Sequence, residues 1–158
     1  MVKQICSSDF ESNEQNNNLE RRDFTRILQA AEPFLEVFLS LPEKHIARVI
    51  VSTAIGKAFT ADLSFNKYRK RVILVTRLLI KNGLSSSQLQ SILRLQSKIE
   101  GLSSPAVDEE TGIVKIRSQS VLPAPILANA VVPHVIKDAV AILEDDALRD
   151  IVDHSVSY

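Results

Sequence analysis

Apolar residues recur at steps of three and four positions along most of the chain. Phe24, Ile27 and Ala31 begin one such series, and a longer series runs from Pro133 to Val152. This spacing places the apolar side chains on one face of an α-helix. We therefore predict helices at 19–39, 41–59, 65–81, 86–100 and 133–153.

The expected ends of these helices carry matching signals. Ser40 followed three residues later by Glu43 forms a capping-box pattern, and Gly83 supplies the left-handed residue that a helix end favours. Residues 65–81 are apolar almost all the way round, which is typical of a central helix.

This pattern predicts an all-α fold, a bundle of about five or six helices. Residues 1–18 are polar and predict a disordered N-terminal arm, because they hold too few apolar side chains to offset the entropy lost on folding. The single helical domain, 19–158, then divides into a helical core with a basic surface (19–101), a loop and extended crossover (102–125) and an acidic C-terminal helix (126–158).

One short stretch reads as a strand. Ile113, Val114 and Ile116 belong to the extended run Ile113–Arg117, for which the sequence shows no partner strand. An unpaired strand can add to the sheet of another chain or pair with its own copy, so these three residues form a candidate partner-docking segment. The alternative is an extended crossover that lies over the helices, and we favour it.

Composition argues against catalytic and metal-binding functions. The 158 residues include one cysteine, Cys6, which excludes an internal disulfide framework and a four-cysteine zinc site. The four glycines are few for an enzyme built on glycine-rich phosphate loops. The three histidines, His45, His134 and His154, lack the spacing of a ligand set, and the chain contains no phosphate-binding glycine loop. We therefore predict no enzyme activity, no cofactor and no metal.

The sequence also predicts an intracellular protein, cytoplasmic or nuclear, without membrane contact. The richest apolar run, Val72–Ile80, is much shorter than the roughly twenty residues that a spanning helix needs. A second run, 121–136, is interrupted by prolines. The lone cysteine fits a reducing compartment.

Charge is segregated along a chain whose formal net charge is zero. Residues 43–100 hold eleven basic and three acidic side chains, whereas 101–158 hold four basic and nine acidic ones. The basic middle could face an anionic partner such as phosphate. We favour the other interpretation, in which the acidic C-terminal helix lies over the basic helices.

Residues 74–96 resemble a helix-turn-helix in their spacing, with Gly83 at the turn. The second helix would present polar and basic side chains to base edges, and the basic run before it would hold phosphates. The candidate contacts to nucleic acid or another anionic partner are Lys67, Arg69, Lys70, Arg71, Gln90, Arg94 and Lys98. We favour a plain helical hairpin, which explains the same spacing, and we interpret the basic run as the solvated edge of an apolar helix.

The leading functional hypothesis is a non-enzymatic adaptor or regulatory module. It would bind a partner helix or peptide, or a second copy of itself in a homo-oligomer, through an apolar groove, because every predicted helix has a wide apolar face. The alternative is a helix-turn-helix regulator that binds nucleic acid through 67–98. A small helical enzyme is the third hypothesis.

Overall fold

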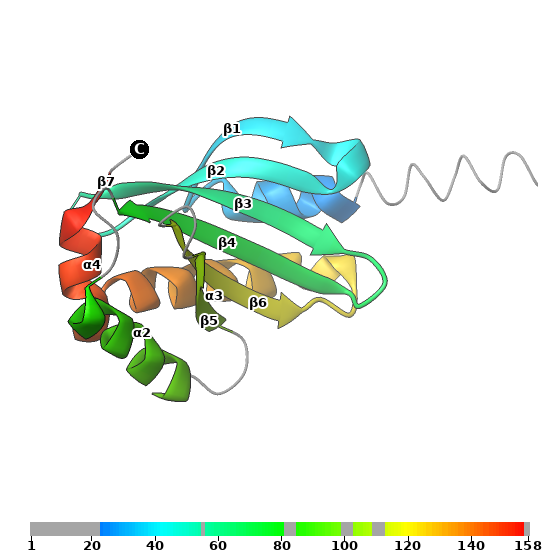
Figure 1. The fold of residues 1–158 in the computed structure, drawn as a ribbon. Coiled ribbons are helices and arrows are strands. Elements are labelled where there is room, and N and C mark those ends of the chain that lie inside the picture. Colours follow the sequence, from blue (N-terminus) through cyan, green and yellow to red (C-terminus); the bar gives the residue numbers. More distant parts are fainter. Residues whose placement is uncertain (1–22, 55, 81–84, 99–102, 109–112, 157–158) are drawn as a thin grey trace, which may run out of the picture.

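The computed structural model describes residues 23–54, 56–80, 85–98, 103–108 and 113–156. Its centre is an antiparallel sheet with the strand order β1-β2-β3-β4-β6-β5, and β7 pairs with the end of β4 (Figure 1). The strands are β1 (Glu36–Leu41), β2 (Ile46–Ser52), β3 (Ala58–Asn66), β4 (Arg71–Ile80), β5 (Ser103–Asp108), β6 (Ile113–Val121) and β7 (Ser155–Val156).

The helices precede, interrupt and follow the strands in the chain. A helix at 23–31 comes before β1. The others are α2 (Ser86–Lys98), α3 (Ala128–Leu143) and α4 (Arg149–His154), with short 3-10 turns at Pro42–Lys44, Pro125–Leu127 and Asp146–Leu148. The helix at 23–31 and α3 lie on the same side of the sheet (Figure 1). The chain is thus a mixed α/β fold with helices on one sheet face.

The strands form because their side chains alternate between a buried and a more open face. In β4, Val72, Leu74 and Leu78 are fully buried, while the residues between them are half-buried or exposed. A period of two is the signature of a strand with one face in the core. The β-branched residues of β2 and β4 also favour extended backbone.

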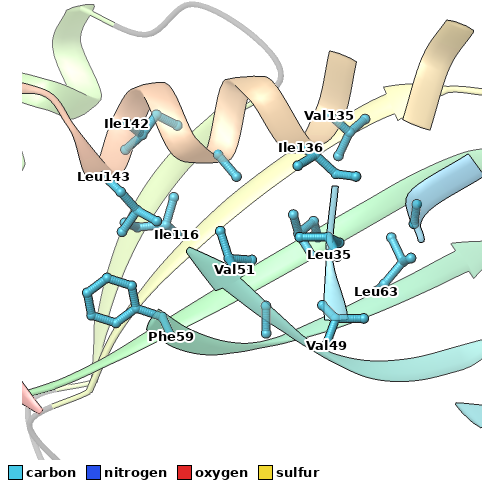
Figure 2. Packing of buried hydrophobic residues seen from close by; sticks show 14 of the residues in the cluster. Leu35, Val49, Val51, Phe59, Leu63, Ile116, Val135, Ile136, Ile142 and Leu143 are labelled. Carbon is cyan, nitrogen blue, oxygen red and sulfur yellow. The ribbon is translucent and has the colours of Figure 1, made fainter. Parts of the chain in front are cut away.

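The core lies between this buried face and the helices. Ile136 and Leu143 of α3 point toward the sheet, and Val51 and Phe59 belong to the same buried cluster (Figure 2). The buried hydroxyl of Ser118, on β6, donates a hydrogen bond to the carbonyl oxygen of residue 135 at 2.7 Å. Packing and this polar contact therefore fix α3 across the strands.

The prediction of an all-α bundle is wrong. The helices expected at 41–59 and 65–81 are the strands β2, β3 and β4. Both faces of these strands carry aliphatic side chains, such as the half-buried Ile73 and Val75 on the more open face of β4. Because apolar residues occupy both faces, their positions also match the three- and four-residue spacing of a helix, and the two-residue alternation of a strand is not visible in the sequence.

Other expectations fare differently. The helices expected at 86–100 and 133–153 are present as α2 and, in pieces, as α3 and α4. The extended segment is also present, but it forms two paired strands, β5 and β6, and not a crossover over helices. The arm expected to be disordered, 1–18, lies outside the described residues.

One helical segment, Pro125–Leu143, is long and apolar enough to cross a membrane by length and composition. Val132, Val135, Ile136 and Ala139 of this segment are buried within the protein core. Burial against the sheet accounts for the apolar character of these four positions, while Ile126 and Leu127 of the same segment are exposed.

We predict that two leucines on β4 contribute very differently to stability. Replacing the fully buried Leu74 by alanine should lower the free energy of unfolding by about 2–5 kcal/mol, because it leaves a cavity in the core. The same change at Leu79, whose exposed fraction is 45%, should have a much smaller effect. Urea unfolding followed by circular dichroism measures both, and equal losses would contradict the described packing.

Candidate functional site

The sheet face opposite the helices carries an alternation of aliphatic and charged side chains. Ile50, Ile73 and Val75 are half-buried on this face, which Figure 1 shows toward the viewer. Leu79 and Lys115 are exposed on the same face. We call this surface the open face.

An ion-pair cluster lies at the centre of the open face. Asp62 is directly opposite Arg48 in the pairing of β2 with β3, and the two side chains are 3.6 Å apart. Arg77, on β4, donates a hydrogen bond to the other carboxylate oxygen of Asp62. Only 15% of the Asp62 side chain is exposed, so this carboxylate depends on its two arginine partners.

One edge of the sheet carries large apolar side chains. β1 stands at the end of the strand order, and its pairing with β2 is interrupted by a bulge between Val37 and Leu39. The exposed fractions are 50% for Phe34, 42% for Phe38 and 46% for Leu39. We call strand Glu36–Leu41 together with Phe34 the β1 edge.

The turn between β3 and β4 concentrates positive charge. We call residues 67–71 the basic tip. The side-chain oxygen of Asn66 accepts hydrogen bonds from the backbone N–H groups of Tyr68 and Arg69, both at 3.1 Å. Lys70 adopts a left-handed φ of 51°, which completes the turn. These contacts give the tip a defined shape, with Tyr68 87% exposed.

A cavity of about 190 Å³ lies beside the basic tip. Phe65 and Leu122 contribute apolar surface to it, as do Pro123 and Pro125, and the charged groups in its lining are Lys67, Lys70 and Asp23. The backbone N–H of Leu122 donates a 2.6 Å hydrogen bond to the carbonyl oxygen of Lys70, which ties the tip to the segment after β6.

The structure separates the candidate anion-binding residues into two groups. Lys67, Arg69, Lys70 and Arg71 lie at the basic tip, at one end of β4. The others, Gln90, Arg94 and Lys98, lie on α2 beyond the opposite end of that strand (Figure 1).

The helix-turn-helix prediction is wrong. Residues 74–80, which would form its first helix, belong to strand β4, and the expected turn at 81–84 lies outside the described residues. Side chains at the basic tip and on α2 cannot then reach one groove as that motif requires. DNA binding therefore has no support in this arrangement.

The candidate docking strand has neighbours on both sides. Ile113, Val114 and Ile116 lie in β6, between β4 and β5. Val114 and Ile116 are fully buried. Both edges of this strand are engaged within the sheet, so a partner strand would need a different edge.

The acidic and imidazole side chains are dispersed. Within the described ranges, no group of three or more His, Cys, Asp or Glu side chains is placed to hold a metal ion. The buried ring of His45 lies 5.9 Å from that of Phe24 and 6.2 Å from that of Phe65, as a packed aromatic group. Asp146 is 3.4 Å from Arg149, in an exposed ion pair on the helical C-terminal region.

Sequence reasoning missed the β1 edge. It assigned Phe38 to the apolar face of a helix at 19–39, whereas the helix ends at residue 31 and β1 begins at Glu36. Pro33 and the run of Val37, Phe38 and Leu39 were the available signals, because proline disfavours a continuing helix and these residue types favour strands.

Comparison with known proteins finds similarity only at the level of structure. No family model matches the chain, and no curated protein matches it. A chain from the crystal structure of the ExsC–ExsE complex is 19% identical, with a TM-score of 0.48 over 77% of this chain and 90% of that one. A chain from the HopA1–SchA chaperone–effector complex is 16% identical, with a TM-score of 0.41 over 78% and 92%.

We predict that the Asp62 cluster contributes a small, salt-dependent stability. Asp62→Asn removes the charge between Arg48 and Arg77 and should lower the free energy of unfolding by about 1 kcal/mol, less at high salt because both arginines are partly exposed. The matched control is Asp146→Asn, in an exposed pair, which should leave stability unchanged. Thermal unfolding at two salt concentrations tests this; equal effects of the two variants would contradict it.

Proposed function

We propose that this chain is a non-enzymatic protein-binding module that takes up an extended, apolar segment of a partner protein as an additional strand at the β1 edge. The observation that carries the proposal is the exposure of Phe34, Phe38 and Leu39 on a strand that ends the sheet order. This replaces the hypothesis of an apolar groove formed by helix faces, because the exposed apolar surface lies at a sheet edge.

The chemistry of a sheet edge selects the partner. Proteins normally protect an edge strand with charged residues, prolines or a covering element, because its backbone can pair with any other strand. β1 has one exposed charge, at Glu36, and a bulge, but its other exposed side chains, Phe38 and Leu39, are large and apolar. An extended segment satisfies both the backbone and the side chains of such an edge, whereas a helix satisfies only the side chains.

The partner's own pattern follows from the strand geometry. Side chains of an added strand alternate between the two faces of the sheet, so every second residue would contact the apolar groups beside β1. We propose a partner segment of alternating apolar and polar residues without proline. Uptake of an extended segment of another protein would make the role of this chain that of a chaperone.

The lone cysteine, Cys6, supports an intracellular setting for this binding. The cytoplasm is the setting we propose, since the DNA-binding hypothesis that motivated a nuclear one has no support.

We predict that a synthetic ten-residue peptide of alternating valine and threonine, with one central phenylalanine, binds the full chain. Phe38→Asp should weaken this binding about tenfold or more, because it places a charge where the apolar contact forms. Fluorescence anisotropy of the labelled peptide measures the affinity. The matched control variant is Leu93→Asp, which changes an exposed apolar residue of α2. This helix contacts β5, at the other end of the strand order from β1, so the variant should leave the affinity unchanged.

A second peptide separates strand addition from nonspecific apolar contact. Replacing every second residue of the peptide by proline removes the N–H groups that a strand must donate, and should abolish binding. Equal binding of the two peptides would contradict strand addition. A dimer of this chain formed through the β1 edges of two copies would also contradict the proposal, because the edge would then be covered. Light scattering would show such a dimer, and Phe38→Asp would dissociate it.

A further inference from the structure

Exposed apolar side chains gather beside the basic tip. Ile126 and Leu127, in the 3-10 turn that follows β6, are 78% and 43% exposed. Val121, the last residue of β6, is 43% exposed, and Tyr68 stands in the basic tip itself. We call the basic tip together with Val121, Ile126 and Leu127 the tip surface.

Contacts among described residues hold the two parts of this surface together. The backbone hydrogen bond from Leu122 to the carbonyl oxygen of Lys70 joins the segment after β6 to the basic tip. Lys70 and Pro125 line the same cavity, so Ile126, the next residue, is held beside the tip. Figure 1 shows the turn between β3 and β4 and the segment between β6 and α3 at the same end of the sheet.

The described residues at this end carry an excess of positive charge. The basic side chains are Lys44, Lys67, Arg69, Lys70 and Arg71. The acidic side chains that line the adjoining cavities are Glu43 and Asp23. Arg69 and Lys70 are exposed, and the ammonium group of Lys67 lies 5.3 Å from the ring centroid of Tyr68. The tip surface therefore attracts anions.

This combination of groups matches the surface of an anionic membrane. Cationic side chains are attracted to anionic headgroups, and apolar side chains beside them enter the boundary between headgroups and acyl chains. A tyrosine, with an apolar ring and a polar hydroxyl, is suited to that boundary. Tyr68 and Ile126 both stand on turns, and a protruding side chain enters a deformable lipid layer without a pocket made to receive it.

We propose that the tip surface binds an anionic membrane peripherally, with Tyr68 and Ile126 in the headgroup region and Arg69 and Lys70 against the anionic groups of the lipids. The sequence predicted no membrane contact because its apolar runs do not suit a spanning helix. A protein that lies on the membrane surface needs no such helix. The proposal does not depend on the function of the β1 edge, which stands at one end of the strand order.

Two other anionic partners would use the same cations. A nucleic acid would engage the arginines and lysines through phosphate and leave Ile126 and Leu127 in water. An acidic protein segment would pair with the same cations, but it would need its own apolar pocket for each protruding side chain. The membrane is favoured because it uses the charge and the exposed apolar groups together.

Co-flotation with lipid vesicles tests the proposal in the full chain. The chain should float with vesicles of phosphatidylcholine that contain phosphatidylserine, and should stay behind with vesicles of phosphatidylcholine alone. Raising the salt from about 0.1 M to about 1 M should weaken the binding, because it shortens the Debye length from about 10 to about 3 Å. Failure to bind the anionic vesicles, or equal binding to both kinds, would overturn the proposal.

Matched variants separate the apolar and the charged contributions. Ile126→Ser leaves the charge unchanged and should weaken binding to the anionic vesicles about tenfold, because a buried apolar side chain is lost. The control is Leu93→Ser, at a position of α2 that is 62% exposed, which should bind like the unaltered chain. Undiminished binding by Ile126→Ser would overturn the proposal.

The charged contribution has its own pair of variants. Arg69→Glu should weaken binding to the anionic vesicles about tenfold or more, because it reverses a charge at the lipid surface. Lys115→Glu makes the same kind of change at an exposed position of the open face and should have a much smaller effect. Equal losses in the two variants would show attraction by net charge alone and overturn the assignment to the tip surface.

Two further measurements distinguish the membrane from other anions. Tyr68→Trp gives the chain its only tryptophan, whose emission should move to shorter wavelengths with anionic vesicles; an unchanged emission would contradict insertion. Soluble glycerophosphoserine should not release the chain from the vesicles, and release would show that the headgroup alone is the ligand. Binding to duplex DNA or to polyglutamate that Ile126→Ser weakens equally would show a different partner and overturn the proposal.

Discussion

Burial of one face of the antiparallel sheet is the constraint on which the rest of this structure depends. β4 lies between β3 and β6, and its Val72, Leu74 and Leu78 meet the helices without any exposed surface. Because side chains alternate along a strand, burying these residues sends Ile73, Val75 and Arg77 to the other face. The open face and its ion-pair cluster are thus a direct consequence of how the core is built.

The same constraint explains why β1 differs from the central strands. β1 is the last strand of the sheet at this side, so it has no neighbouring strand beyond it. Phe34, Phe38 and Leu39 are exposed there. At the other end of the strands, the turn held by Asn66 presents positive charge beside the point where the helix at 23–31 begins. The two surfaces differ in chemistry: one exposes apolar side chains at a sheet edge, and the other exposes basic side chains at a turn.

Some of this arrangement was available from the sequence and some was not. The helical periods of 86–100 and 133–153 are strong because one face is polar, and α2 and α3 lie there. In 65–81, apolar residues occupy both faces, so Val72, Ile73, Leu74 and Val75 satisfy a helix pattern as well as a strand pattern. The basic run 67–71 was visible in the sequence, but its place on a β-turn beside Asp23 depends on contacts between distant segments, which a local pattern does not contain.

The central claim, that the β1 edge accepts an extended partner segment, is tested most directly by amide hydrogen exchange of β1 in the full chain with and without the strand-forming peptide. Strand addition gives the outward backbone N–H groups of β1 new acceptors, so exchange of residues in Glu36–Leu41 should slow in the complex, while exchange in β6 stays unchanged. A peptide that binds without slowing exchange in β1, or that protects another surface instead, would contradict the account.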